Sequence, residues 1–288
     1  MDRRPRLAKC NDEMTVMPAD GFEQIDYERF VYFRSSRLHE LGVKHLFSTR
    51  ISTRGGVRAD FNIGFRNCAA QEMPLEARRA ACDILAADLS GLTVARQVHS
   101  GRAVVVDSRD VGRGARSAED GIPDADGMVT EAPGASLLIL TADCLPVLIY
   151  DPAGRVGAFH AGWRGALAGI ARNTIDLMVN RLCSRRADLI AVLGPAIQKC
   201  CFQVGRDVAR RFMAASRRCG QEVVHSDNGR FFVDLPAFVK CELIAQGLAQ
   251  KNVMDIGLCT SCLPELFYSF RRDGRLVGSM GAIIALGR

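Results

Sequence analysis

Apolar residues along the chain fall mostly into short runs, with fewer segments at helical spacing. The short runs predict strands at residues 31–33, 43–50, 104–106, 136–140, 146–150, 156–160 and 188–193. Helical spacing predicts helices over 75–89, 165–182 and 207–219, the last closed by Gly220, and a further helix capped by Asp234. Residues 266–270 and 276–286 predict a hairpin around 272–274. Strands outnumber those of a regular β-α-β alternation, so we expect a mixed α/β (α+β) fold: mixed sheets with outer helices in a single domain.

The N-terminal residues differ in composition from the rest of the chain. Residues 1–24 contain Pro5, Pro18 and mixed charges, which predicts a poorly ordered lead-in, with the folded domain over residues 25–288. The N-terminus lacks the apolar core of a secretory signal, and no run of 18 apolar residues occurs. We therefore expect a cytoplasmic protein without a membrane partner.

Charge narrows the range of partners. The 38 Lys and Arg residues exceed the 32 Asp and Glu residues, which gives a formal net charge of +6. The basic residues are scattered and are not interleaved with aromatic residues, so a nucleic-acid partner is not expected. A small anionic ligand fits this balance. No G-x-G-x-x-G follows a strand, so a dinucleotide-binding fold has little support.

Eleven cysteines are present, and the number is odd. Without a secretion signal we expect reduced thiols, most of them packed as small apolar residues. Cys259 and Cys262 form one C-x-x-C, and Cys200 and Cys201 are adjacent. A four-cysteine zinc site usually has a second spaced pair, which is missing, so we do not expect structural zinc there.

Three polar residues interrupt or end apolar strands: His99 in RQVHS, Cys144 in TADCLPV and His160 in GAFHAGW. Imidazole nitrogen and thiolate sulfur both suit zinc or copper. Two histidines and one cysteine leave one tetrahedral position open, as in catalytic zinc sites. The residues are far apart in sequence, and buried histidines and a buried thiol in the core are the alternative interpretation.

The same residues also suit nucleophilic catalysis. Cys144 would act as a thiolate with His99 or His160 as its base, and Asp143 would orient an imidazole. The residue types do not separate this use from metal binding. Arg164 lies in the H-A-G-W-R-G stretch just before a predicted helix, which predicts an anion site or, alternatively, a plain strand-to-helix turn.

Several sequence blocks together resemble one family. In chain order they are FSTR at 47–50, GGV at 55–57, NIG at 62–64, RQVHS at 96–100, DADGMVT at 124–130, LTADCLPVLIYD at 140–151, HAGWRG at 160–165, GPAI at 194–197 and FYSFRRDG at 267–274. They resemble the laccase-domain family, also called YfiH-like or multicopper polyphenol oxidase. The resemblance covers roughly residues 43–284, and its TADC and HAGWRG blocks are highly specific.

The resemblance implies a purine nucleoside phosphorylase that uses a purine nucleoside and phosphate, acts also on methylthioadenosine and deaminates adenosine. It implies that His99, Cys144 and His160 are the metal ligands, with zinc as the expected metal and copper as the alternative. The substrate-binding candidates on the family blocks are Arg50, Arg54, Asn62 and Arg164, the arginines being candidates for phosphate.

This sequence departs from the family pattern in three places. Four residues separate Arg50 from Gly55 where members usually have one, so either Arg50 or Arg54 is the equivalent arginine. Gln203 stands where Glu is common, and Ser279 where Arg is often found. The oligomeric state is not predicted.

Two other functions remain as alternatives. One is a cysteine hydrolase that edits a cell-wall precursor, with Cys144 as nucleophile. The other is a copper phenol oxidase, which the histidine inventory disfavours. A multicopper oxidase needs many histidine ligands, and this chain has 5, even counting His39, His45 and His225.

Overall fold

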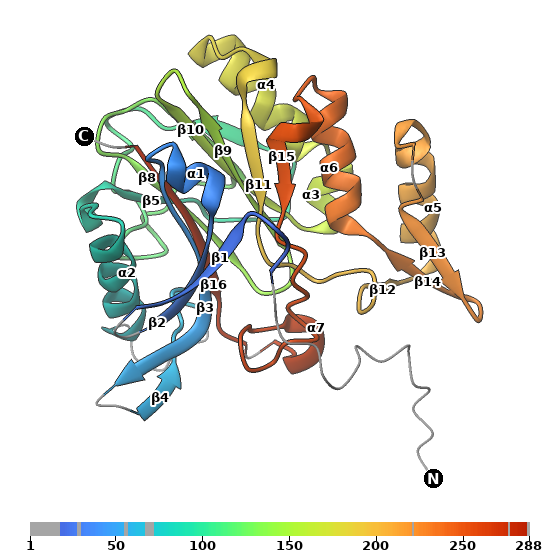
Figure 1. Ribbon diagram of the computed structural model, residues 1–288, viewed down its shortest axis with the longest axis horizontal. Helices are drawn as coiled ribbons and strands as arrows, with labels where there is room; N and C mark the ends of the chain where they lie inside the picture. The colour runs from blue at the N-terminus through green and yellow to red at the C-terminus, as the bar shows by residue number, and fades with distance from the viewer. Residues whose placement is uncertain are drawn as a thin grey trace.

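The computed structural model describes residues 18–286, apart from 28–29, 55–56, 67–71, 221 and 276. Residues 1–17 of the expected lead-in therefore lie outside the described residues, and the first strand begins at Phe22. Two β-sheets pack against each other, and helices cover their outer faces (Figure 1). The mixed α/β fold with outer helices, expected from the strand and helix patterns, is confirmed.

A seven-stranded sheet forms one of the two inner layers. Its order is β1-β2-β3-β16-β8-β5, with β4 paired to β3. The strands are β1 (Phe22–Tyr27), β2 (Phe30–Ser35), β3 (Lys44–Arg54), β4 (Val57–Asp60), β5 (Leu92–Val94), β8 (Ser136–Thr141) and β16 (Met280–Ala285). All pairs are antiparallel except β5 with β8, so the sheet is mixed.

A six-stranded sheet forms the other inner layer, in the order β15-β11-β9-β10-β7-β6. Its strands are β6 (Ala103–Val105), β7 (Gly127–Thr130), β9 (Leu145–Asp151), β10 (Arg155–Ala161), β11 (Ile190–Leu193) and β15 (Val253–Asp255). β15 runs parallel to β11, and β6 runs parallel to β7. A small sheet of β12 (Gln203–Val204), β14 (Arg230–Val233) and β13 (Val224–Asp227) lies beside it.

The helices lie outside the two large sheets, and the fifth packs against the small sheet (Figure 1). They are α1 (Ser36–Glu40), α2 (Glu72–Ile84), α3 (Trp163–Leu167), α4 (Ile170–Leu182), α5 (Arg206–Ala215), α6 (Leu235–Ala245) and α7 (Phe270–Asp273). Short 3-10 turns occur at Leu89–Gly91, Arg186–Asp188, Ser216–Arg218 and Gln250–Asn252. Within the described chain, every helix is too short or too polar to cross a bilayer.

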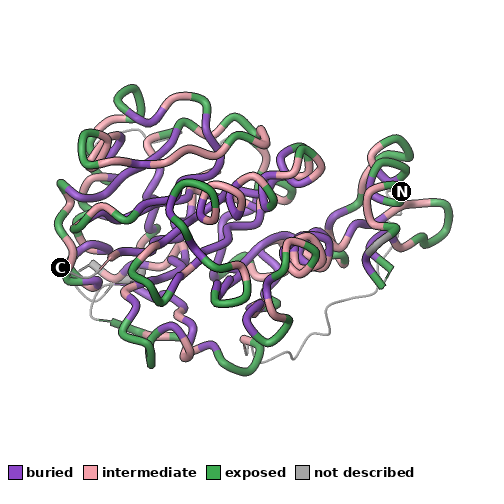
Figure 2. The backbone as a smooth tube through the Cα atoms, turned by 90° about the horizontal axis from the view of Figure 1, so that it is seen from above, coloured by how far each residue is buried: buried purple, intermediate pink, exposed green. Residues whose placement is uncertain are grey.

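Three clusters of buried apolar residues pack the layers together. One fills the space between the sheets and joins Phe47 and Ile139 of the seven-stranded sheet to Leu148 and Ala158 of the six-stranded sheet. A second packs α3–α6 on the outer face of the six-stranded sheet, and a third packs α2 on the other sheet. Figure 2 shows the buried segments running through this interior, with exposed loops around them. Strands buried on both faces explain why their sequences are continuous apolar runs.

Some sequence predictions need correction. The helix expected over 165–182 is split into α3 and α4 by Gly169, whose φ is +81°. The hairpin around 272–274 is wrong, because only β16 forms. The preceding segment turns into α7 instead, where the hydroxyl of Ser269 accepts a hydrogen bond from the Arg272 N–H. The expectation of reduced thiols fails at one pair, since Cys219 and Cys241 form a disulfide.

Candidate metal centre and active site

Cys144 lies in the tight connection between β8 and β9, where Asp143 has a φ of +89°. A non-glycine residue rarely adopts this conformation unless its neighbours fix it. The buried Asp143 carboxylate accepts hydrogen bonds from the Thr260 hydroxyl and the Arg271 backbone N–H, both at 2.6 Å. Asp143 therefore holds the turn that carries Cys144, and its hydrogen bonds run to these groups instead of an imidazole.

His160 lies near the end of β10, beside the Cys144 turn. In the antiparallel pairing of β10 with β9, His160 faces Pro146 and Ala161 faces Leu145. The His160 ring is buried, and its Nδ1 lies 2.9 Å from Oδ1 of Asp126, which is fully buried immediately before β7. If Nδ1–H donates to the carboxylate, Nε2 remains as the nitrogen for a metal ion or for the Cys144 sulfur.

His99 comes from the loop between β5 and β6 and is exposed, with a φ of +61°. The backbone N–H groups of Val98, His99 and Ser100 donate to the Asp126 carboxylate at 3.2, 3.0 and 2.6 Å. The Ser100 hydroxyl donates to it as well, at 2.8 Å. One buried carboxylate thus fixes the backbone under His99 and orients the ring of His160.

The ligand atoms of His99, Cys144 and His160 lie within 4.8 Å of one another. The two imidazole rings meet edge to face, with centroids 4.8 Å apart. Gly162 closes the floor of the site: a Cβ there would lie 2.8 Å from Cδ2 of His99 and 3.0 Å from Sγ of Cys144. The structure brings the three predicted residues together, and their donor set and spacing fit one tetrahedral ion with an open position.

The charges of the site favour the ionised forms of its residues. Burial alone would raise the pKa of Cys144, but the charge of His160 and hydrogen bonds from both histidines lower it to about 6. Burial would lower the pKa of His160, yet Cys144 and Asp126 raise it to about 9. Burial would raise the pKa of Asp126, but bonds from His160 and Ser100 lower it to about 2. A thiolate is the form that ligates metals and attacks electrophiles.

Arg164, predicted to bind an anion, lies in the first turn of α3 and is exposed. Its guanidinium carbon lies 4.3 Å from the centroid of the Trp163 ring, and that of Arg211 from α5 lies 5.4 Å from the same ring. Two guanidinium groups therefore flank the tryptophan that follows His160 by three residues. The two guanidinium groups offer positive charge to an anion.

The other substrate-binding candidates lie in β3 and in the loop after β4. The Arg50 guanidinium pairs with Asp60 at 3.1 Å and lies 4.5 Å from the Tyr268 ring centroid. Asn62 is buried, and its Oδ1 accepts from the backbone N–H of Gly64 and of Ser279, so it joins two loops. The side chain of Arg54 lies outside the described residues.

Two of the three departures from the family pattern, Ser279 and Gln203, make hydrogen bonds to residues other than the three candidate ligands. Ser279 donates its backbone N–H to Asn62, so its contact is with a loop. Gln203 is exposed on β12, and its backbone carbonyl accepts from the Arg271 guanidinium at 2.9 Å. Neither of these hydrogen bonds involves His99, Cys144 or His160.

Sequence reasoning assigned no role to Asp126 or Thr260. Asp126 lies in the DADGMVT block, where a carboxylate directly precedes an apolar strand. That pattern is the signal that could have identified it, since a buried carboxylate needs several hydrogen-bond donors. Thr260 carries no comparable signal, because a single threonine in a loop is common.

The other three histidines of the chain lie away from this group. His45 is buried in β3, where it bonds to Ser35 and Val43. His39 is in α1 and His225 in β13. Among the described residues, none of these three joins a group of side chains able to hold a metal ion. The site therefore lacks the histidines of a multicopper centre.

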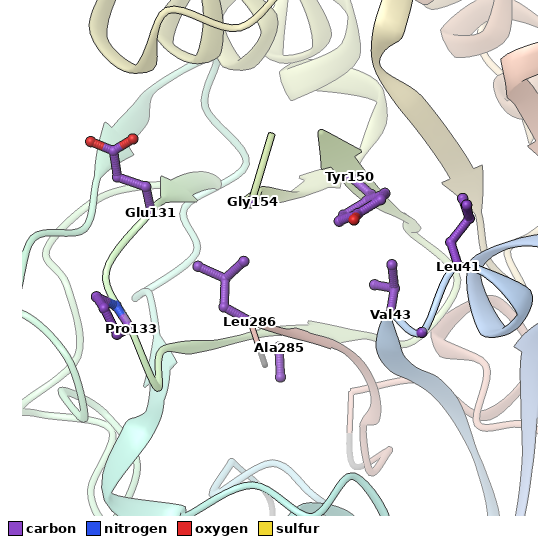
Figure 3. A pocket seen from close by; sticks show the side chains of 9 residues that line it. Leu41, Val43, Glu131, Pro133, Tyr150, Gly154, Ala285 and Leu286 are labelled. Carbon is purple, nitrogen blue, oxygen red and sulfur yellow. The ribbon is translucent and has the colours of Figure 1, made fainter. Parts of the chain in front are cut away.

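A surface hollow elsewhere has no part in this chemistry. Figure 3 shows its lining, which includes Val43, Glu131, Tyr150 and Leu286. Tyr150 lies near the far end of β9 from Cys144, and at ~3.3 Å per residue the two are roughly 20 Å apart. The candidate metal ligand Cys144 lies at the opposite end of this strand.

Several proteins of named activity are similar to this chain in sequence. Purine nucleoside phosphorylase YlmD of Bacillus subtilis is 32% identical over 210 residues, which are 73% of this chain and 76% of the relative. A purine nucleoside phosphorylase of Deinococcus radiodurans is 34% identical over 257 residues, covering 88% and 92%. Adenosine deaminase RL5, from an unknown prokaryotic organism, is 34% identical over 203 residues, covering 69% and 77%.

Solved structures show the same fold. The crystal structure of YlmD from Geobacillus stearothermophilus has a TM-score of 0.84 and 28% identity, and covers 92% of this chain and 99% of that one. A Bacillus licheniformis protein, YfiH, has a TM-score of 0.83 and 29% identity, covering 93% and 99%. The family model described as multi-copper polyphenol oxidoreductase laccase matches residues 44–287. With this match over most of its length, the chain belongs to the multi-copper polyphenol oxidoreductase laccase family.

Proposed function

We propose that this protein is a metal-dependent purine nucleoside phosphorylase that cleaves adenosine, inosine or methylthioadenosine with phosphate and also deaminates adenosine. The names of its relatives support the reaction class. The observation that carries the proposal is the convergence of His99, Cys144 and His160 around a carboxylate, Asp126, that positions both histidines.

His99, Cys144 and His160 would hold the ion, with zinc as the proposed metal and copper as the alternative. Such an ion supplies Lewis acidity toward water or a substrate oxygen. Asp126 keeps the His160 ring turned toward the site, and its negative charge makes that imidazole a stronger donor. Gly162 leaves the space that the His99 ring and the Cys144 sulfur occupy.

Phosphorolysis needs groups that bind phosphate and orient it, and the neighbouring arginines would supply them. A phosphate oxygen attacks C1′ of the ribose while the N-glycosidic bond breaks, so positive charge grows on the sugar and negative charge on the departing purine. Arg164 and Arg211 would hold phosphate beside the site, and Arg50 is a further candidate. Orientation of phosphate against C1′ is the main contribution expected of these residues.

The test uses zinc-loaded protein with adenosine, inosine or methylthioadenosine, with and without inorganic phosphate. We expect free purine and the pentose 1-phosphate, quantified by liquid chromatography, to form only when phosphate is present. Arg164→Ala should raise the KM for phosphate about tenfold, since it removes a charge-assisted contact. Arg181→Ala, which removes an exposed charge from the end of α4, is the matched control and should leave that KM unchanged. Purine release at the same rate without phosphate would contradict the proposal.

One observation favours a second candidate, a cysteine-type hydrolase. Asp126, His160 and Cys144 are arranged as orienting carboxylate, imidazole and thiol, and the lowered pKa of Cys144 favours its thiolate. The two functions separate in a timed iodoacetamide reaction followed by peptide mass spectrometry. A metal-ligating Cys144 should alkylate slowly until a chelator is added, whereas a nucleophile should alkylate quickly with or without chelator.

A further inference from the structure

Four cysteines gather at a second position, away from the histidine ligands. Cys200 and Cys201 lie in the loop between β11 and β12, and Cys259 and Cys262 lie in the loop that follows β15. β11 and β15 are parallel neighbours, so both loops leave the same edge of the six-stranded sheet. A bridge between Ala196 and Cys259 extends this pairing into the loops. The topology thus brings two cysteine pairs together that are about 60 residues apart in the sequence.

The four sulfur atoms lie close together. All four lie within 4.8 Å of one another, and the Cys262 Sγ is 3.5 Å from that of Cys200 and 3.4 Å from that of Cys201. None of the four belongs to a disulfide. In a tetrahedral zinc tetrathiolate, Zn–S bonds of ~2.3 Å put neighbouring sulfurs roughly 3.8 Å apart. We propose that Cys200, Cys201, Cys259 and Cys262 bind one zinc ion as a structural tetrathiolate site.

The surroundings of the cluster suit a site with excess negative charge. The Gln198 backbone N–H points at the Cys259 sulfur, 3.5 Å away. The Arg271 guanidinium donates to the Cys201 carbonyl, and the Arg272 guanidinium donates to the carbonyls of residues 260 and 261. A zinc ion with four thiolates carries a net charge of about −2, and nearby N–H and guanidinium groups stabilise such charge. Each thiol gives up its proton to solvent as it coordinates.

The position of the cluster assigns it a role in supporting the turn between β8 and β9 that carries Cys144. Thr260, between two of the cysteines, donates to the Asp143 carboxylate, and the Ile197 N–H donates to the Asp143 carbonyl at 2.9 Å. Both loops that carry the cysteines therefore hold the residue next to Cys144. An ion that ties the loops together would fix this turn without contacting substrate.

The test separates the two metal sites by variant. His99→Ala/His160→Ala removes two ligands of the catalytic centre, and in this background we expect about one zinc per chain after anaerobic loading, measured by elemental analysis. Adding Cys262→Ser should remove most of that zinc. Adding Cys183→Ser, which changes an exposed cysteine on another loop, is the control and should leave it in place. Loss of zinc from the background variant itself, while it remains folded by circular dichroism, would refute the site.

A second measurement covers the case in which Cys262→Ser does not fold. The His99→Ala/His160→Ala protein keeps all four cysteines, so it can be loaded with cobalt(II) as a spectroscopic probe. A tetrathiolate site should give thiolate-to-cobalt charge-transfer bands and the visible bands of tetrahedral cobalt. A spectrum without thiolate ligation overturns the proposal, as does peptide mapping that shows a disulfide among these cysteines in anaerobically purified protein.

Discussion

Replacement of Asp126 by Asn tests the central claim about the active site, that one carboxylate builds it. The side chain keeps its size but loses its charge and turns one oxygen into an N–H₂ group. That group would face donors, because both carboxylate oxygens already accept hydrogen bonds, from His160 and from the backbone around Ser100. The substitution therefore acts on both histidine ligands without touching them.

The magnitude follows from the structure. The pKa of Asp126 is lowered to about 2 from an ordinary value of 3.8. This corresponds to about 2 kcal/mol of folding free energy at neutral pH. Because the folded state favours the carboxylate, that stability is present above pH 3.8 and is lost as the pH falls toward 2. Asp126→Asn lacks it at every pH. Loss of a carboxylate behind a metal-bound histidine also weakens metal affinity by roughly 10- to 100-fold.

Two assays check this prediction, and Asp124→Asn serves as the control. Asp124 lies two residues away, is exposed and leaves the site's hydrogen bonds intact. Urea denaturation gives the change in folding free energy, and competition with a chromophoric chelator gives the zinc affinity of the catalytic centre. If Asp126→Asn matches the control in both measurements, the carboxylate does not build the site and the reasoning fails.

Three further predictions concern single positions. His99→Ala or His160→Ala should each lose about one zinc per chain by elemental analysis, and full occupancy in both would rule out the triad. Gly162→Ala puts a methyl group 2.8 Å from the His99 ring, so zinc affinity should fall at least tenfold while Gly220→Ala, which meets no atom within 4 Å, leaves it unchanged. Burial lowers the pKa of His45 to about 4. The folded state therefore favours neutral His45, and about 3 kcal/mol of stability should disappear as the pH falls from 6.5 to 4. His45→Phe should remove that loss from denaturation curves, and parallel pH profiles would contradict it.

Much of the architecture could be predicted from the sequence because the strands are buried on both faces. Continuous apolar runs such as 136–140 and 146–150 became β8 and β9. Local chemistry also sufficed where one side chain decides a boundary: Asp234 caps α6, accepting from the Ala237 N–H at 3.0 Å. The split at Gly169 could not be predicted from apolar spacing, because α3 and α4 keep the same buried periodicity on both sides of it.

Long-range contacts explain what sequence reasoning missed. Residues 266–270 have strand-like composition, but only Phe270 enters a regular element, as the first residue of α7. There Ser269 accepts a hydrogen bond from the Arg272 N–H, and Asp143 accepts one from the Arg271 N–H. Cys200 and Cys201 are adjacent in the sequence and do not form the second spaced pair of a usual zinc site, so no zinc was expected there. The parallel pairing of β11 with β15 brings them next to Cys259 and Cys262. The three candidate ligands were identified because their sequence blocks resemble a family, since spacing alone does not place them together.

Two residues of the candidate site have a strained backbone, although positive φ also occurs at other non-glycine residues of the described chain. His99 and Asp143 both have positive φ, at +61° and +89°. Each such conformation costs about 1–3 kcal/mol and persists only where the surroundings hold it. Three backbone N–H groups that donate to the Asp126 carboxylate hold the backbone at His99. Hydrogen bonds from Thr260 and Arg271 to the Asp143 carboxylate hold the backbone at Asp143. A backbone with negative φ at these two positions would avoid this cost. We therefore infer that the strained geometry is kept because it directs an imidazole and a thiol to one point, where a bound ion would offset part of the cost.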